Sequence, residues 1–345
     1  MEKRETPYYI NWAITGKCNL NCIHCRGMES KDLTMGEAKK LINEIKELNP
    51  QFLTIDGGEP LMREDLFPLL EYATRKEIKT YVITNGIFLT EKIVKKLKKM
   101  EVRVMVSLDS VVATKYNQIR RGGDFETVVK GIKICGEYNI LNAVNMVLMK
   151  INYSEIPAMI KFAEQVKAEQ IIFIGLKQTE NYPYQELVLN SSEWKEAISL
   201  IAKTPSKIDI FVDEPFFWPA IKEFKLSLSM KRDREESGIR IQEDNSCIFG
   251  KYLFIQPNGD VQPCTFAPVI FGNIKREPLP EIWDKIQNSE LLQKINDLSL
   301  RKGHCKNCKY FAECKGCRSR IYALTGDWLQ SDPICPLREK TGLKD

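Results

Sequence analysis

The sequence predicts an α/β protein, in which a partial (β/α)6 barrel of the TIM type is followed by a smaller cysteine-rich domain. Two observations predict this fold class. Over residues 8–202, short apolar segments alternate with amphipathic ones, which is the pattern of parallel βα units. The alternation then stops, and seven of the eleven cysteines follow residue 246.

The predicted strands are short, apolar and rich in β-branched or aromatic residues, as is typical of strands buried on both faces. They cover residues 8–15, 52–56, 79–84, 103–109, 142–149 and 170–176, with a further strand at 207–212. Helices are predicted at 35–48, 64–76, 91–100, 125–138, 154–168 and 193–202. The first helix has a clear start, because Thr34 and Glu37 have the spacing of a capping box.

Composition narrows the class of protein. The formal net charge of +5 is spread along the chain, so we expect no nucleic acid partner. No run of 18 apolar residues exists, so no membrane span is expected. Because no signal-peptide core precedes the first strand, we expect a cytoplasmic protein whose reduced thiols bind metal. The two histidines, His24 and His304, both lie beside cysteines, which argues against a Ser-His-Asp triad.

The domain boundaries follow from the change in composition. Residues 230–244 are charged and aperiodic, which predicts a surface linker or lid. We therefore expect a barrel with its following helices at 1–229, a linker at 230–246 and a cysteine-rich domain at 247–345.

The first cysteine cluster follows the first predicted strand directly. Cys18, Cys22 and Cys25 form a CxxxCxxC array on one loop. Three thiolates are able to hold three irons of a 4Fe–4S cluster and leave the fourth iron without a protein ligand. Two alternatives remain open at this point, a zinc site that includes His24 and a simple electron-transfer cluster.

This array resembles that of the radical S-adenosylmethionine (SAM) enzymes. The second strand ends in Asp56-Gly57-Gly58-Glu59-Pro60, similar to the family's GGEP motif. The resemblance implies that polar groups at the strand ends bind SAM and that His24 packs near its adenine. The implied contacts are Gly57, Gly58, Glu59, Thr84, Asn85, Ser107, Asp109, Arg121, Leu176 and His24. Among them Arg121 is expected to pair with the methionine carboxylate, which an arginine fork suits.

The resemblance also implies the reaction. SAM bound at the open iron is cleaved by one electron to give a 5′-deoxyadenosyl radical, which abstracts hydrogen from an unactivated carbon. Such cleavage needs a low reduction potential. A ferredoxin or flavodoxin is therefore the expected electron donor.

The cysteines of the C-terminal region resemble the seven-cysteine SPASM domain of these enzymes, which binds two auxiliary 4Fe–4S clusters. The resemblance implies a nearer cluster held by Cys247, Cys264 and Cys317, whose fourth ligand stays open. It implies a farther cluster held by Cys305, Cys308, Cys314 and Cys335. The two-residue spacer between Cys314 and Cys317 departs from the three-residue spacer of many members, and two zinc sites are the alternative.

Three stretches of the C-terminal region bear on the branch of the family. The stretches 314–318, 325–327 and 332–335 are similar to the branch that matures cofactors, which includes haem-pathway enzymes and maturases of peptide-derived cofactors.

The eleventh cysteine, Cys135, lies on the apolar face of a predicted helix, and we expect a core residue there.

The sequence constrains the identity of the substrate less than it constrains the fold or the cofactors. Asp213 and Glu214 precede three aromatic residues after the last predicted strand. They are candidates for taking up a proton, although the segment also fits an ordinary hydrophobic start of a helix. Only seven residues precede the first strand, so we expect no fused peptide-recognition module.

We therefore expect oxidative maturation of a small cofactor precursor of tetrapyrrole or pterin type. The nearest alternative is the maturation of a ribosomal peptide or a protein side chain, with a separate recognition protein. An alternative of another class is an iron–sulfur electron-transfer or scaffold protein.

Overall fold

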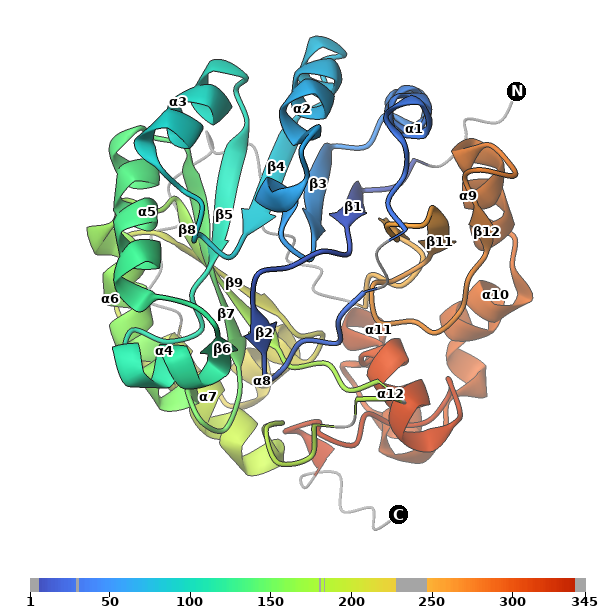
Figure 1. Cartoon of the computed structure of the whole chain (residues 1–345). Coiled ribbons are helices and arrows are strands. Elements are labelled where there is room, and N and C mark those ends of the chain that lie inside the picture. Colours follow the sequence, from blue (N-terminus) through green and yellow to red (C-terminus); the bar gives the residue numbers. More distant parts are fainter. Residues whose placement is uncertain (1–5, 29–30, 180, 183, 228–246, 339–345) are drawn as a thin grey trace. The chain divides into compact units, whose positions relative to one another are not determined.

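The computed structural model describes residues 6–28, 31–179, 181–182, 184–227 and 247–338 (Figure 1). The chain divides into two compact units. Unit 1 contains Met1–Ser107, Arg120–Asn142 and Ile248–Leu292, and unit 2 contains Leu108–Ile119, Ala143–Cys247 and Gln293–Asp345. The linker expected at 230–246 lies outside the described residues.

Unit 1 is built on a mainly parallel sheet with the strand order β12-β11-β10-β1-β3-β4-β5. The strands of this sheet are β1 (Tyr9–Thr15), β3 (Phe52–Gly57), β4 (Thr80–Thr84), β5 (Arg103–Ser107), β10 (Leu253–Ile255), β11 (Asp260–Gln262) and β12 (Gly272–Asn273). Its helices are α1 (Met35–Leu48), η1 (Pro60–Met62), α2 (Leu66–Arg75), α3 (Glu91–Lys99), α5 (Phe125–Glu137) and α9 (Leu279–Gln287). A separate two-stranded sheet pairs β2 (Asn21–Cys22) with β6 (Arg120–Arg121).

Side chains alternate between the two faces of this sheet. Ile10, Trp12 and Ile14 of β1 are fully buried on one face. On the other face, the Tyr9 ring stacks on those of Phe52 at 5.1 Å and Tyr252 at 4.7 Å. The period-two pattern of the sequence therefore separates a helix-covered face from a second face, and we call the face of Tyr9 and Phe52 the inner face.

Unit 2 contains the parallel strands β7 (Leu141–Leu148), β8 (Gln170–Gly175) and β9 (Asp209–Asp213) in that order. The unit boundary falls within β7 and within α10 (Glu290–Asn296). The other helices of unit 2 are α4 (Ala113–Ile119), η2 (Tyr153–Glu155), α6 (Ile156–Gln165), α7 (Ser191–Lys203), α8 (Phe217–Glu223), η3 (Leu298–Leu300), η4 (Gly303–Asn307), α11 (Phe311–Cys314) and α12 (Arg318–Thr325).

The α/β partial barrel expected from the sequence is confirmed. Six parallel strands are followed by helices in the pairs β1–α1, β3–α2, β4–α3, β5–α4, β7–α6 and β8–α7, and a seventh, β9, is followed by α8. The first helix has the predicted bounds, and its capping box is present, with the Glu37 backbone N–H donating to Thr34 Oγ1 at 3.3 Å. Sequence patterns missed the two-residue strands β2 and β6 and the helix α4, and they also missed the strands and helices that follow residue 246.

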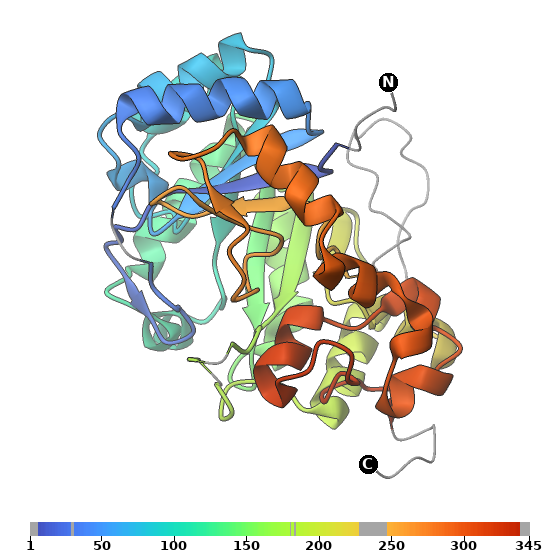
Figure 2. The same cartoon turned by 90° about the vertical axis from the view of Figure 1, so that its right-hand side faces the viewer.

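The division into units cuts through the cysteine-rich region expected at 247–345. Residues Ile248–Leu292 belong to unit 1 because β10 pairs in parallel with β1, with Ile10 opposite Leu253. The Glu44 carboxylate of α1 also accepts a hydrogen bond of 2.9 Å from the Leu279 backbone N–H at the start of α9. In Figures 1 and 2, α9 lies beside α1. Strand pairing joins segments far apart in the sequence here, which a composition boundary does not show.

Candidate functional site

The cysteine loop of unit 1 begins where β1 ends. Its β2 segment pairs antiparallel with β6, so that Cys22 lies opposite Arg120 and Asn21 opposite Arg121. The Cys25 backbone N–H donates to the Cys22 carbonyl at 3.1 Å, which closes a tight turn. Cys18 and Cys25 are exposed and Cys22 is half-buried, so the three thiols lie at an accessible surface.

The glycines that follow β3 allow this loop to pack against the strand end. The Gly58 N–H donates to the Thr15 carbonyl at 2.7 Å, and the Glu59 N–H donates to the Lys17 carbonyl at 2.7 Å. A Cβ at Gly58 would overlap the Lys17 carbonyl, and Gly57 has a φ of +136°. Only glycine meets both conditions, so the two glycines bring the β3 end and the cysteine loop into backbone contact.

The Glu59 carboxylate joins the ends of β3 and β4 and is fully buried. It accepts hydrogen bonds from Thr84 Oγ1 at 2.7 Å, from the Asn85 N–H at 2.8 Å and from the Leu61 N–H at 3.1 Å. Burial raises the pKa of Glu59, while these hydrogen bonds and the charge of Arg120 oppose the rise. Asn85 Nδ2 donates to Asn19 Oδ1 at 2.8 Å, so the network reaches the cysteine loop.

Two adjacent arginines, Arg120 and Arg121, lie opposite residues of the cysteine loop. Arg121 is exposed, whereas Arg120 is 6% exposed. Residues directly opposite in an antiparallel pair project on the same face, so Arg120 lies on the face of Cys22. The charge of Arg120 lowers the pKa of both Glu59 and Cys18 against the effect of burial. The geometry therefore favours Arg120 over Arg121 as the cationic group of this site.

The remaining expected contacts lie in different environments. Asp109 is fully buried, and its carboxylate accepts a hydrogen bond of 2.8 Å from the Val147 N–H. Ser107 ends β5 and is half-buried, and Leu176 is 7% exposed just after β8. His24 is half-buried between two of the loop cysteines.

Asp56 is a site residue that sequence reasoning missed. It lies on the inner face near the end of β3, where its Oδ2 accepts a hydrogen bond of 3.1 Å from Asn11 Nδ2. Its Oδ1 is buried and has no hydrogen-bond partner among the described residues. Burial raises the pKa of Asp56 to about 6, and Asn11 and Arg26 oppose the rise. The sequence feature that could have identified Asp56 is its position directly before the two glycines.

The cysteines of unit 2 fall into two groups. Burial raises the pKa of Cys314, and its neighbours Cys335 and Cys305 raise this pKa further. Burial likewise raises the pKa of Cys335, where the neighbouring thiols are Cys305 and Cys308. Burial raises the pKa of Cys317 to about 11, and among thiols Cys247 is its neighbour. Cys264 belongs to unit 1, where it packs near Tyr252.

Backbone N–H groups distinguish the expected ligands from an ordinary buried cysteine. In six of the ten expected ligands the N–H two residues further on donates to the sulfur, at 3.3 Å for Gly27 to Cys25 and for Gly316 to Cys314. The six are Cys18, Cys25, Cys264, Cys308, Cys314 and Cys335. Such donors favour the thiolate, the form that binds metal. For Cys135, in contrast, burial alone raises the pKa, to about 12, as expected of a core thiol.

Two buried arginines also fit an anionic group in unit 2. Arg301 is 3% exposed and Arg318 is fully buried. Three nitrogens of Arg301 and two of Arg318 have no hydrogen-bond partner among the residues that the structure describes. Burial and the charge of Arg318 lower the pKa of Arg301 to about 10, while Cys305 and Cys247 oppose the fall. Buried cations of this kind need a counter-charge, and the thiolates and sulfides of an iron–sulfur cluster supply one.

No three Cys, His, Asp or Glu side chains among the described residues close around a single ion. The sulfurs that bind a four-iron cluster lie farther apart than the ligands of a single ion. The cysteines, their N–H donors and the buried arginines therefore fit a cluster although they do not surround one ion.

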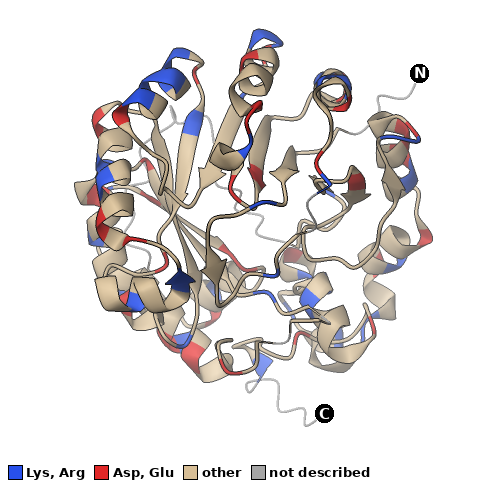
Figure 3. Cartoon of the chain, in the orientation of Figure 1, with Lys and Arg blue, Asp and Glu red and all other residues tan. Residues whose placement is uncertain are grey.

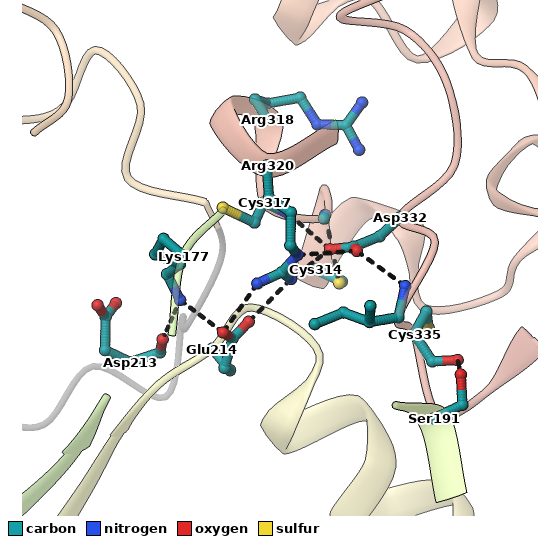
Figure 4. Close-up of polar contacts among 12 residues, drawn as sticks. Lys177, Ser191, Asp213, Glu214, Cys314, Cys317, Arg318, Arg320, Asp332 and Cys335 are labelled. Carbon is teal, nitrogen blue, oxygen red and sulfur yellow. Dashed lines mark hydrogen bonds and ion pairs between the residues drawn. The ribbon is translucent and has the colours of Figure 1, made fainter. Parts of the chain in front are cut away.

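Glu214 does not have the surroundings of an acid–base group (Figure 4). It is 1% exposed and accepts hydrogen bonds from Lys177 Nζ at 2.6 Å and from two nitrogens of Arg320 at 2.9 and 3.0 Å. Both of its oxygens are therefore held in ion pairs. Asp213 is half-buried at the end of β9, and its carbonyl oxygen accepts a hydrogen bond of 2.6 Å from Lys177.

Charged side chains elsewhere are of mixed sign. In the view of Figure 3, both signs occur on most helices, and basic residues predominate along α3. No helix among the described residues is both long and apolar enough to cross a bilayer.

The chain matches two protein family models. Residues 12–163 match the radical SAM superfamily, and residues 247–318 match an iron–sulfur cluster-binding domain, SPASM. The chain is 31% identical to an AdoMet-dependent heme synthase of Methanosarcina barkeri, over 96% of this chain and 97% of the relative. It is 29% identical to the Fe-coproporphyrin III synthase of the same organism, over 98% of this chain and 90% of the relative.

A third relative and a solved structure extend the comparison. The chain is 26% identical to the mycofactocin maturase MftC of Mycolicibacterium smegmatis, over 96% of this chain and 83% of the relative. Among solved structures, Streptococcus suis SuiB has the same fold, with a TM-score of 0.74, 18% identity, and coverage of 96% of this chain and 77% of that chain.

The N–H···S pattern leads to a test of which buried cysteines bind iron. We expect Cys335→Ala to remove about four irons per chain, and Cys135→Ala, the matched buried control, to remove none. Iron and acid-labile sulfide analysis after anaerobic reconstitution measures both. Equal iron contents in the two variants would contradict the assignment.

Proposed function

The chain belongs to the radical SAM superfamily, and from this premise we propose that it is an enzyme that oxidatively matures a tetrapyrrole cofactor precursor. The observation that carries the proposal is the 31% identity to an AdoMet-dependent heme synthase along nearly the whole of both chains. The Fe-coproporphyrin III synthase, at 29% identity, also acts in tetrapyrrole chemistry by its name. Membership of this superfamily makes the protein an enzyme rather than a simple electron carrier.

We propose three clusters with the ligand sets implied by the sequence. Cys18, Cys22 and Cys25 hold the first cluster and leave one iron open for SAM. The grouping of Cys305, Cys308, Cys314 and Cys335 in unit 2, and the pairing of Cys317 with Cys247, support the two auxiliary sets. When bound, the first cluster and SAM supply a 5′-deoxyadenosyl radical that removes hydrogen from the substrate. A low-potential ferredoxin or flavodoxin is the proposed donor.

We propose that the chain's own residues position SAM. Gly57 and Gly58 expose backbone at the strand end, and the buried Glu59 holds that backbone against Thr84 and Asn85. We assign the SAM carboxylate to Arg120, whose charge lies beside Glu59 and Cys18. Ser107, Leu176 and His24 remain proposed contacts of the nucleoside.

Exchange of the two adjacent arginines tests this assignment. Arg120→Met should weaken SAM binding about tenfold or more, because a charged hydrogen bond to a carboxylate contributes about 1.5–3 kcal/mol. Arg121→Met is the matched control and should bind SAM as the wild type does. Equilibrium binding to the reconstituted protein measures both, and weaker binding in the Arg121 variant alone would reverse the assignment.

We further propose Asp56 as the group that takes up a proton in a dehydrogenation. In such a step one carbon would lose a hydrogen atom to the 5′-deoxyadenosyl radical and an electron to an auxiliary cluster, and the neighbouring atom would release a proton to a base as the double bond forms. Asp56 has one buried oxygen without a partner on the inner face of unit 1, and Arg26 balances its charge.

The pH dependence of product formation tests Asp56. Its pKa is raised to about 6, so the carboxylate is the reacting form above that pH and is lost as the pH falls through it. Product formation should therefore fall below about pH 6 in the wild type. Asp56→Asn should lower product formation at pH 8 while 5′-deoxyadenosine formation continues. An unchanged rate and pH profile in this variant would exclude the role.

Coupled turnover tests the function itself. The reconstituted enzyme, dithionite and SAM should release 5′-deoxyadenosine faster when Fe-coproporphyrin III is added, and the porphyrin should change in mass. Cys18→Ala should abolish SAM cleavage and keep the auxiliary clusters. If no tetrapyrrole stimulates the reaction, the proposed substrate class is wrong.

A peptide substrate is the second candidate. The 26% identity to a mycofactocin maturase over 96% of this chain favours it. In the same assay, stimulation by a short peptide together with a separate recognition protein, and by no tetrapyrrole, would establish this candidate.

A further inference from the structure

A buried ion-pair network lies at the ends of two strands of unit 2 (Figure 4). Lys177 follows β8, Glu214 follows β9, Arg320 is in α12, and Asp332 lies in the loop before Cys335. Their exposed fractions are between 0 and 5%. Four charged side chains without solvent contact therefore meet in one place.

The network is closed by short hydrogen bonds. Lys177 Nζ and both terminal nitrogens of Arg320 bind Glu214, at 2.6, 2.9 and 3.0 Å. Arg320 also binds Asp332, through Nε at 3.1 Å and Nη2 at 2.6 Å. Two positive and two negative charges balance, which limits the cost of burying them.

The network contacts the backbone of two cysteine loops. Asp332 Oδ2 accepts the Cys317 N–H at 3.2 Å, and the Asp332 carbonyl accepts the Cys335 N–H at 3.2 Å. In Figure 4 the Cys317 sulfur lies on the side of the network where Lys177 lies. One charged group thus connects the strand ends with Cys317 and Cys335.

We propose that Lys177, Glu214, Arg320 and Asp332 are positioning residues that fix Cys317 and set the reduction potential of the cluster it holds. This inference rests on the proposed ligand role of Cys317. Reduction adds negative charge to a cluster, so a fixed cation nearby raises the potential and a fixed anion lowers it. Outer groups of this kind tune metal sites without touching the metal.

The opposite charges of Lys177 and Glu214 provide the test. In the reconstituted full-length protein, Lys177→Met should lower the potential of one auxiliary cluster, and Glu214→Gln should raise it. Redox titration followed by electron paramagnetic resonance measures the shifts. The affected signal should be the one that Cys317→Ala removes. A purely structural role predicts no such reversal of sign.

Lys302→Met is the matched control, because it removes the same charge in the same unit. Its ion pair with Asp327 is exposed, with 53% of the lysine side chain accessible, so solvent screens it. It should leave every potential unchanged. The double variant Lys177→Met with Glu214→Gln keeps the net charge, and its potential should return toward that of the wild type.

The outcomes separate this inference from the proposed function. If Cys317→Ala loses no iron, the ligand assignment itself is wrong. If Cys317→Ala loses about four irons but Lys177→Met and Glu214→Gln shift no potential, or shift it in the same direction, only the inference is overturned. Where a single variant loses the auxiliary iron and keeps the first cluster, the positioning role is supported. If one single variant fails to fold, the other decides, because a shift of its potential in the predicted direction supports the role and an unchanged or opposite shift overturns it.

Discussion

The buried carboxylate of Glu59 is the interaction on which the site of unit 1 depends. A carboxylate without solvent is costly unless hydrogen bonds surround it. Here a side chain and two backbone N–H groups bind it, from the end of β4 and from the turn that follows the glycines. The same turn is held to the cysteine loop by backbone hydrogen bonds. The strand ends and the loop therefore keep a common geometry, which a reactive site requires.

In unit 2 a buried cation, rather than a buried anion, holds neighbouring segments together. Arg320 binds two carboxylates at once, and its planar fork is suited to both. Glu214 accepts from both Arg320 and Lys177, so it joins the two cations of this network. An acidic residue at a strand end is thus catalytic or structural according to the cations that surround it.

The core cysteine Cys135 and the expected ligand cysteines have different surroundings. Cys135 is surrounded by apolar side chains of α5, and nothing offsets the cost of ionising it. Cys18 and Cys25 lie in a loop and Cys314 ends the short helix α11, so that the peptide N–H two residues further on donates to each sulfur. A helix cannot offer that group, because its N–H groups are already bonded within the helix. Local backbone geometry therefore prepares the ligand cysteines for metal.

The sequence by itself determined the fold class, the strand–helix pairs and the cysteine pattern, because each depends on residues close together in the chain. Periodicity marks a buried strand, and ligand spacing marks a loop. Tertiary structure alone decided which of two adjacent arginines faces Cys22, because that depends on the pairing of β2 with β6. It also decided that Glu214 is held in ion pairs with Lys177 and Arg320, and that Asp56 keeps an oxygen without a partner among the described residues. These properties arise from neighbours that are distant in sequence, and no local pattern records them.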